Sequence, residues 1–180
     1  DCGKAIEQLG KYNIGTILDY SVEGKESEVD FDACCKETIE TIHRAKGDKN
    51  IPFCVFKVTG LARFDLLEKV TAKQTLTKEE TEEYERVKER VNKICSEAYS
   101  NNKPIFIDAE ESWIQIAIDD LANENMARYN KTSAIVYNTF QMYRKDRLEY
   151  LDHSVAIGKT NAYHVGAKLV RGAYMEKERK

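Results

Sequence analysis

Several features that would assign a sequence to a common functional class are missing from this one. Lysine and arginine together number 28 against 31 aspartates and glutamates, which gives a formal net charge of -3 at pH 7. Without a basic excess the chain offers no charged stripe to neutralise phosphates, so we expect no nucleic-acid partner. No hydrophobic run approaches the roughly 20 residues that a membrane-spanning helix needs. Any contact with a membrane should therefore be peripheral.

Metal and redox motifs are missing as well. The five cysteines show no C-x-x-C spacing, and the adjacent pair Cys34 and Cys35 is not part of a metal-binding pattern. The three histidines, His43, His153 and His164, are scattered without the spacing of metal ligands. We expect no metal site and interpret the cysteines as free thiols in a reducing compartment.

A glycine-rich dinucleotide-binding turn is also absent, because no apolar run is followed by a G-x-G-x-x-G pattern. What the chain does contain is short apolar runs that alternate with helical patterns. Its 180 residues are 42% hydrophobic and 33% charged, a composition typical of one soluble globular domain. We therefore expect residues 1–180 to form a single domain.

The apolar runs predict five strands, separated by amphipathic helices. The expected strands are Ile14–Leu18, Ile51–Phe56, Pro104–Ile107, Ser133–Tyr137 and Ala167–Val170. None of them alternates polar with apolar residues, so they should be buried on both faces in a parallel sheet. Helical spacing predicts helices over about 2–12, 31–47, 61–76, 77–99, 110–121 and 140–157. Thr77 followed by Glu80 resembles a capping box at the start of the 77–99 helix. The buried stripe expected on that helix consists of Tyr84, Val87, Val91, Ile94, Cys95 and Ala98. Trp113 and Ile116 are expected to face the core.

Polar residues stand at or near the C-terminal end of every predicted strand: Asp19, Lys57, Asp108, Gln141 and Lys168. A (β/α)8 (TIM) barrel builds its active site at this end of its strands. The fold class is therefore α/β, and we expect the chain to cover about the first five βα units of such a barrel. The alternative is an open, doubly wound sheet of five strands, which would be complete at this length.

Lys168 is the least expected of these residues, because it lies within an apolar run. A buried charge costs free energy unless another group pairs with it. Gly172 follows closely, where the backbone can approach a ligand. Lys168 is thus a candidate ligand contact.

Taken singly, the other candidates have ordinary explanations. Lys57 could be a solvated lysine at the rim, and Asp108 could cap the helix that follows it. Gln141 could lie on the surface near a helix start, and Tyr174 could be a packing aromatic. The pattern of residues alone leaves these alternatives open.

The order of several short motifs resembles that of the proline dehydrogenase family. Lys168–Arg179 is similar to the family's fifth-strand signature, and Ile107–Glu111 resembles its third-strand motif. Phe56–Leu61 resembles the second strand end, Asp19–Glu23 more faintly the first, and Tyr137–Tyr143 supplies the glutamine of the fourth. The resemblance runs from about Ile14 to Lys180.

This resemblance implies a FAD-dependent oxidoreductase of proline catabolism with a TIM-barrel fold. The family oxidises L-proline to 1-pyrroline-5-carboxylate, passes a hydride to the flavin and delivers electrons to a quinone. It further implies a cytoplasmic protein in peripheral contact with the inner membrane, on the matrix side of the mitochondrion in a eukaryote. An aldehyde dehydrogenase is implied as a fusion or a partner.

The resemblance also implies roles for individual residues. Lys57 would bind the substrate carboxylate, and Tyr174 would border the proline ring. Asp108 would be a catalytic carboxylate beside the cofactor. Glu23 would act as a lid partner.

The remaining predicted residues belong to the cofactor site. Gln141 would contact the flavin ring, and Arg171, Gly172 and Ala173 would line the flavin and its phosphates. Lys168 would be a catalytic cation beside the flavin, at a position where many bacterial relatives have arginine. Lysine keeps the charge but lacks the planar fork of a guanidinium. A cation near the ring would favour flavin reduction.

Two other functions remain open. The first is a non-catalytic, TIM-like binding or assembly domain without a flavin. The second is a hydroxyproline dehydrogenase. The presence of a flavin absorption band would separate the first of these from an enzyme.

Overall fold

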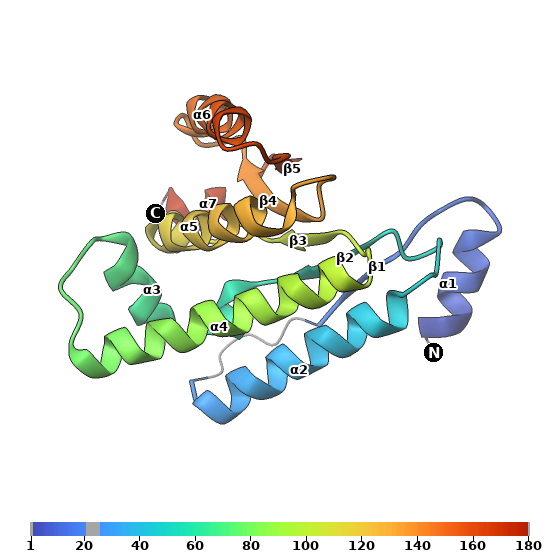
Figure 1. The fold of residues 1–180 in the computed structure, drawn as a ribbon, viewed down its shortest axis with the longest axis horizontal. Helices are drawn as coiled ribbons and strands as arrows, with labels where there is room; N and C mark the ends of the chain where they lie inside the picture. The colour runs from blue at the N-terminus through green and yellow to red at the C-terminus, as the bar shows by residue number, and fades with distance from the viewer. Residues whose placement is uncertain (1, 21–25, 180) are drawn as a thin grey trace.

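The computed structural model describes residues 2–20 and 26–179, in which helices alternate with short strands (Figure 1). The strands are β1 (Ile17–Asp19), β2 (Phe53–Phe56), β3 (Ile105–Ile107), β4 (Val136–Gln141) and β5 (Gly166–Val170). The helices are α1 (Cys2–Gly10), α2 (Glu28–Ala45), α3 (Phe64–Thr71), α4 (Lys78–Ser100), α5 (Ser112–Tyr129), α6 (Arg147–Thr160) and α7 (Met175–Glu178), with a 3-10 turn, η1 (Val58–Gly60), after β2.

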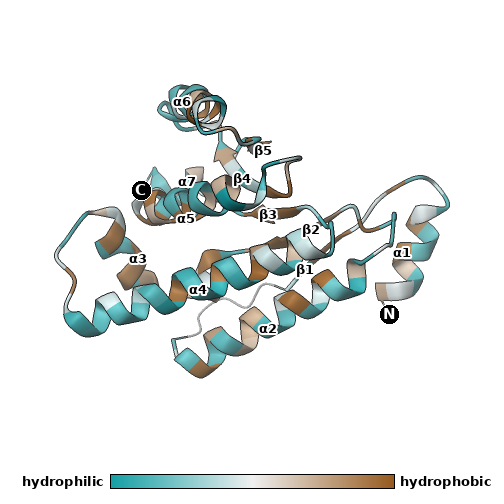
Figure 2. Cartoon of the chain, viewed as in Figure 1, coloured by the Kyte–Doolittle hydropathy of each residue, from teal (hydrophilic) through white to brown (hydrophobic). Residues whose placement is uncertain are grey.

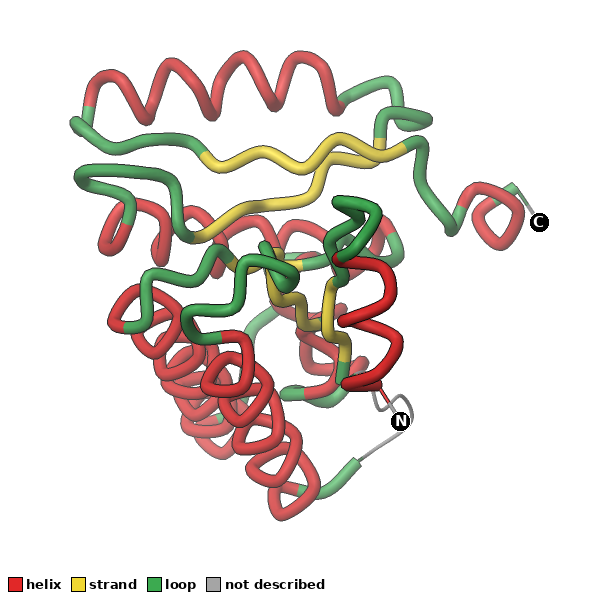
Figure 3. The backbone as a smooth tube through the Cα atoms, turned by 90° about the vertical axis from the view of Figure 1, so that its right-hand side faces the viewer, coloured by secondary structure: helices red, strands yellow, loops and turns green. Residues whose placement is uncertain are grey.

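The five strands form one parallel sheet in the order β1-β2-β3-β4-β5. Each strand therefore pairs with the next strand in the sequence, and right-handed crossovers then place the connecting helices on one face. Figure 3 shows the strands together in the middle of the view with helices around them. A doubly wound sheet would reverse its strand order at a switch point. The described strands show no reversal, so that alternative is wrong and the fold is TIM-barrel-like.

The core lies between the sheet and the helices that cover it. Apolar residues recur along α2 and α4 at helical intervals, with hydrophilic residues between them (Figure 2). The stripe predicted for α4 is confirmed for its fully buried members, which are Val87, Val91, Ile94, Cys95 and Ala98. Burying a large aliphatic side chain contributes about 1.5–3 kcal/mol, so this face fixes α4 against its neighbours.

The start of α4 is fixed by the capping box that the sequence predicts. The Thr77 hydroxyl oxygen accepts a hydrogen bond from the Glu80 amide at 3.2 Å. In return, the Glu80 carboxylate accepts one from the Thr77 amide at 3.0 Å. Two amides that a helix start leaves without partners are satisfied in this way.

The fourth strand lies further along the chain than predicted. It spans Val136–Gln141, and α6 begins at Arg147 instead of Phe140. The side-chain oxygen of Asn130 accepts hydrogen bonds from the Ile135 and Val136 amides, at 3.0 and 2.9 Å, and holds the preceding loop out of the sheet. The strand also continues through polar residues, because their side chains find partners inside the protein.

Two expectations of burial are wrong. Trp113 and Ile116 are 37% and 42% exposed, since α5 turns Ile114 and Ile118 inward instead. Leu169 in β5 is 59% exposed, although a strand buried on both faces was expected. Among the described strands, β5 pairs with β4 alone, so one of its sides has no strand beside it.

All five cysteines are free thiols, as the sequence predicts. Burial raises the pKa of Cys35 and of Cys54 to about 11, which keeps both thiols protonated at neutral pH. Within residues 2–20 and 26–179, no helix has both the length and the apolar character required to cross a membrane.

Candidate functional site

The register of the sheet brings the predicted strand-end residues into one row. Phe56 pairs with Ile107, Ile107 with Asn138, and Thr139 with Lys168. One residue further on, Lys57 and Asp108 are therefore level with Thr139 and Lys168. The row crosses four neighbouring strands at their carboxyl ends, the edge where parallel barrels carry their sites.

Six of the predicted residues line one cavity at this edge, which we call the strand-end cavity. It has a volume of about 430 Å³ and includes Ala109, Thr139 and Val170 in its wall. The predicted residues in that wall are Asp108, Gln141, Lys168, Arg171, Gly172 and Ala173. The structure thus places the two predicted catalytic residues and the predicted cofactor contacts around a common space.

An ion pair neutralises Lys168. Its ammonium nitrogen donates to Asp108 Oδ1 at 2.6 Å, and the two side chains are 27% and 22% exposed. The ammonium also lies 4.9 Å from the centroid of the Phe106 ring, within range of a cation–π contact. Asp108 therefore does not cap the following helix, which begins only at Ser112. The capping alternative for Asp108 is wrong.

Gln141 is the last residue of β4 and is only 2% exposed. Its side-chain nitrogen donates to the Glu110 carbonyl at 2.6 Å, so the amide is held in one orientation. The alternative of a surface glutamine near a helix start is wrong, because the strand extends as far as this residue.

The backbone conformation at position 172, beside the strand-end cavity, requires a glycine. Its φ angle is +116°, a region that L side chains rarely adopt. A Cβ atom there would lie 2.3 Å from the Tyr143 ring and 3.0 Å from Gln141 Oε1. The chain over Arg171–Ala173 can therefore follow the cavity wall closely only because residue 172 has no side chain.

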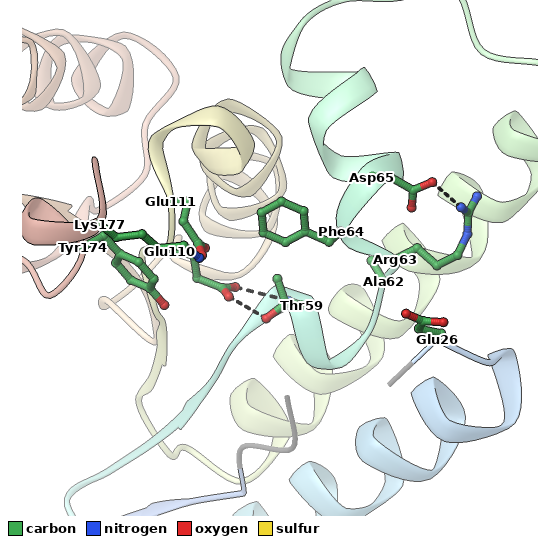
Figure 4. Close-up of a pocket in the computed structure, with 10 residues that line it drawn as sticks. All are labelled: Glu26, Thr59, Ala62, Arg63, Phe64, Asp65, Glu110, Glu111, Tyr174 and Lys177. Carbon is green, nitrogen blue, oxygen red and sulfur yellow. Dashed lines mark hydrogen bonds and ion pairs between the residues drawn. The ribbon is translucent and has the colours of Figure 1, made fainter. Parts of the chain in front are cut away.

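The two predicted substrate contacts do not line the strand-end cavity. Tyr174 lines a second cavity of about 620 Å³, which we call the Glu110 cavity, together with Thr59, Phe64 and Lys177 (Figure 4). Lys57 follows β2 and lines neither cavity, but its charge acts on Glu110. Glu23, the predicted lid partner, lies outside the described residues.

Glu110 projects into its cavity and contacts Thr59 through both carboxylate oxygens (Figure 4). Oε1 accepts from the Thr59 amide at 3.2 Å, and Oε2 accepts from the Thr59 hydroxyl at 2.5 Å. Glu110 is 2% exposed, and this burial raises its pKa to about 7. The hydrogen bonds from Thr59 and the positive charge of Lys57 lower the pKa of Glu110, while the negative charge of Glu111 raises it further.

The backbone of Glu110 is held as well. Its amide donates to Gln115 Oε1 at 2.9 Å, and Gln115 Nε2 donates to Asp119 Oδ1 at 2.9 Å. Asp119 also accepts from Asn138 at 2.9 Å and from Arg147 at 2.7 Å. Asp119 and Arg147 have side chains only 4% and 6% exposed, and removal of one member of such a pair leaves a buried charge unpaired.

The family model for proline dehydrogenase matches residues 2–180. The chain belongs to the proline dehydrogenase family. The resemblance seen in the strand-end motifs is thereby confirmed.

Curated relatives support the assignment. The chain is 30% identical over 172 residues to the carbapenem antibiotics biosynthesis protein CarD of Pectobacterium carotovorum subsp. carotovorum, covering 96% of this chain and 46% of that protein. It is 30% identical over 211 residues to the mitochondrial proline dehydrogenase 1 of Dictyostelium discoideum, covering 96% of this chain and 37% of that protein. The chain thus spans less than half the length of either relative.

Solved structures support the fold. The proline utilization A (PutA) protein of Bdellovibrio bacteriovorus, inactivated by N-propargylglycine, matches with a TM-score of 0.79 at 14% identity, over 98% of this chain and 19% of that one. PutA of Corynebacterium freiburgense matches with a TM-score of 0.75 at 16% identity, over 99% of this chain and 18% of that one. At these identities the likeness shows a common fold.

Sequence reasoning missed the polar residues that support the candidate site. Glu110 lies two residues after the predicted Asp108 in the third-strand motif, which was the one available signal. Gln115 and Asp119 are spaced i, i+4 on α5, so they share one face of the helix. Neither residue was singled out in the sequence, and both are buried.

The raised pKa of Glu110 predicts a pH dependence that Glu110→Gln should remove. The folded state binds this proton more tightly than the unfolded state, whose carboxyl has a pKa near 4.5. The contribution of Glu110 to stability is therefore complete below pH 4.5 and is lost as the pH rises through about 7. Relative to the wild type, Glu110→Gln should gain up to about 2.5 kcal/mol in free energy of unfolding between pH 5 and pH 8.

Urea denaturation of the protein that contains this chain, at both pH values, measures the difference. The matched control is Glu85→Gln, an exposed carboxylate on α4 that pairs with Lys88, and it should show little change with pH. A difference between Glu110→Gln and wild type that stays constant from pH 5 to pH 8 would contradict the prediction.

Proposed function

We propose that the protein is a flavoenzyme of proline catabolism that oxidises L-proline to 1-pyrroline-5-carboxylate, using FAD as its cofactor and a quinone as its electron acceptor. The observation that carries this proposal is the strand-end cavity. It brings Asp108, Gln141 and Lys168 together at the edge where a barrel of this family would hold its flavin. The family membership of the chain supports the same reaction.

The residues of the strand-end cavity fit a flavin ring. The volume of about 430 Å³ lies within the range of small-molecule sites and suits a ring system more than a whole dinucleotide. Gln141 supplies an oriented amide and Lys168 a cation, the two kinds of group that match ring carbonyls and nitrogens. The tight backbone at Gly172 allows Arg171–Ala173 to lie against the ring and the chain that leads to its phosphates. When bound, the flavin supplies the hydride acceptor.

The side chains around that ring have distinct tasks. Lys168 places positive charge beside the ring, which favours its reduction. Asp108 orients Lys168 through the 2.6 Å ion pair. Lys57, level with Asp108 in the same row, would attract the carboxylate of proline, and Tyr174 would border its ring.

Flavin absorption and its response to substrate test the proposal. The purified protein that contains this chain should be yellow, and anaerobic L-proline should bleach its flavin band. A colourless protein that does not take up added FAD would refute the proposal and favour a binding or assembly domain. Bleaching by hydroxyproline but not by proline would instead identify a hydroxyproline dehydrogenase.

The setting of the enzyme belongs to the same proposal. Several relatives carry the word mitochondrial in their names, and one solved neighbour is described as a bifunctional PutA protein. We propose peripheral contact with the inner membrane, where the quinone resides, and an aldehyde dehydrogenase as fused domain or partner.

Lys57→Ala should weaken the use of proline without removing the cofactor. Loss of a charge-assisted contact to the substrate costs about 2–3 kcal/mol, or roughly 30- to 150-fold in kcat/KM. The change should appear mainly as a higher KM for proline, with flavin content unchanged. Steady-state kinetics measure this change. A wild-type KM and kcat/KM in the variant would indicate that Lys57 is a solvated lysine at the rim without a role in binding.

Lys168→Met should lower the midpoint potential of the flavin. The substitution keeps a long side chain but removes the charge beside the ring. A loss of about 1–2 kcal/mol corresponds to roughly 20–40 mV for a two-electron couple. Hydride transfer should slow in parallel, while proline binding changes less.

The ion pair with Asp108 provides the competing explanation for Lys168. If the lysine serves only as a structural partner of that carboxylate, the melting temperature should fall and the potential should stay at the wild-type value. Spectroelectrochemistry and thermal unfolding of the same variant separate these outcomes.

A further inference from the structure

We propose that Glu110 is a positioning residue that, through Thr59, fixes Lys57 relative to Asp108 and Gln141. The inference rests on the proposed function, because it concerns how the substrate-binding lysine is held. Nothing in the sequence singled out Glu110 beyond its place two residues after Asp108 in the third-strand motif.

Several hydrogen bonds converge on the buried residue Glu110. The Glu110 side chain receives two hydrogen bonds, both from Thr59. Its amide donates to Gln115, and its carbonyl accepts from Gln141. A carboxyl group that is 2% exposed costs free energy to bury, and only such partners offset that cost.

These bonds join the ends of three strands. Thr59 lies in the turn after β2, Glu110 follows β3, and Gln141 ends β4. Lys57 is two residues before Thr59, and Asp108 is two residues before Glu110. The carboxylate of Glu110 therefore connects the segment that carries Lys57 to the segment that carries Asp108.

Glu110 contacts Gln141 and Thr59 through different groups, its backbone carbonyl and its side-chain carboxylate. Gln141 is held by the peptide carbonyl, which any residue at position 110 would supply. Thr59, by contrast, is bonded by the carboxylate of Glu110 and not by its backbone. Truncation of the side chain should therefore loosen the turn after β2 and shift Lys57, while the Phe56 carbonyl stays bonded to the Asp108 amide and Gln141 stays in place.

The Glu110–Thr59 contact does not require a negative charge. A hydroxyl group can donate or accept, so a neutral carboxyl could donate to the Thr59 oxygen while still accepting from the Thr59 amide. Glutamine can make the same two bonds. The groups packed around Glu110 include Lys57 and Glu111, whose charges act on it in opposite directions. If Glu110 only holds Thr59 in place, Glu110→Gln should behave like the wild type. If Glu110 acts through its charge or transfers a proton, Glu110→Gln should be impaired.

The test compares Glu110→Ala, Glu110→Gln and Lys57→Ala in the purified protein that contains this chain. Glu110→Ala should raise KM for L-proline 10-fold or more, with kcat and flavin content changed less than 3-fold. Glu110→Gln should restore KM to within about 3-fold of wild type. The double variant Lys57→Ala/Glu110→Ala should have the KM of Lys57→Ala, because Glu110 acts through that lysine.

A matched control separates position from stability. Val91→Ala truncates a core residue on α4, which carries none of the site residues, and should lower the melting temperature while KM keeps its wild-type value. If Glu110→Gln is as impaired as Glu110→Ala, or if the effects of Lys57→Ala and Glu110→Ala multiply in the double variant, the inference is overturned.

A second measurement does not depend on activity. Crystal structures of Glu110→Ala and Glu110→Gln should show Lys57 and Thr59 displaced from β3 in the first and unmoved in the second. Unmoved residues in Glu110→Ala would overturn the inference. A wild-type protein that neither binds flavin nor oxidises proline would refute the proposed function, while the crystallographic comparison would still decide how position 59 is held.

Discussion

The ion pair between Lys168 and Asp108 is the interaction on which the arrangement of the strand ends depends. A lysine within a strand needs an anion close by, and Asp108, which follows β3 two strands away, supplies one. The pair can form only if β4 holds the register that puts Thr139 between them. Registers that are one residue out would separate the two charges and turn side chains to the other face. The contact is thus compatible with only one alignment of the three strands.

The sequence predicted the regular parts of the fold, because those parts follow from local patterns. The alternation of apolar runs with helical stripes indicated parallel βα units, and Thr77 with Glu80 marked the start of α4. The prediction failed at β4, where the strand continues through Asn138 and Gln141. Those residues are tolerated because partners far along the chain bond to them, and no local pattern reports such partners. The outward turn of Trp113 has the same origin, since packing and not composition decides which face of α5 is buried.

The same limit applies to the candidate site. Asp108, Gln141 and Lys168 could be found because they stand at or near the ends of predicted strands and because family motifs include them. Glu110 and Asp119 could not, since their importance lies in contacts that the fold creates. A glutamate in a run of acidic residues looks solvated until the structure shows it bonded to Thr59 on another strand end.

The polar residues at the strand ends differ in exposure, and the difference separates those that can meet a ligand from those that hold the structure. Lys168 and Asp108 remain partly open to the strand-end cavity, so a ligand can compete for either charge. Asp119 and Arg147 are almost fully enclosed, and no ligand can reach them. A buried pair of this kind adds little net stability, because desolvation cancels much of its attraction. Its value is geometric: Asp119 holds Gln115, Gln115 holds the Glu110 amide, and the Glu110 carbonyl holds Gln141. Rigid, enclosed charges thereby orient the more exposed groups that meet the ligand.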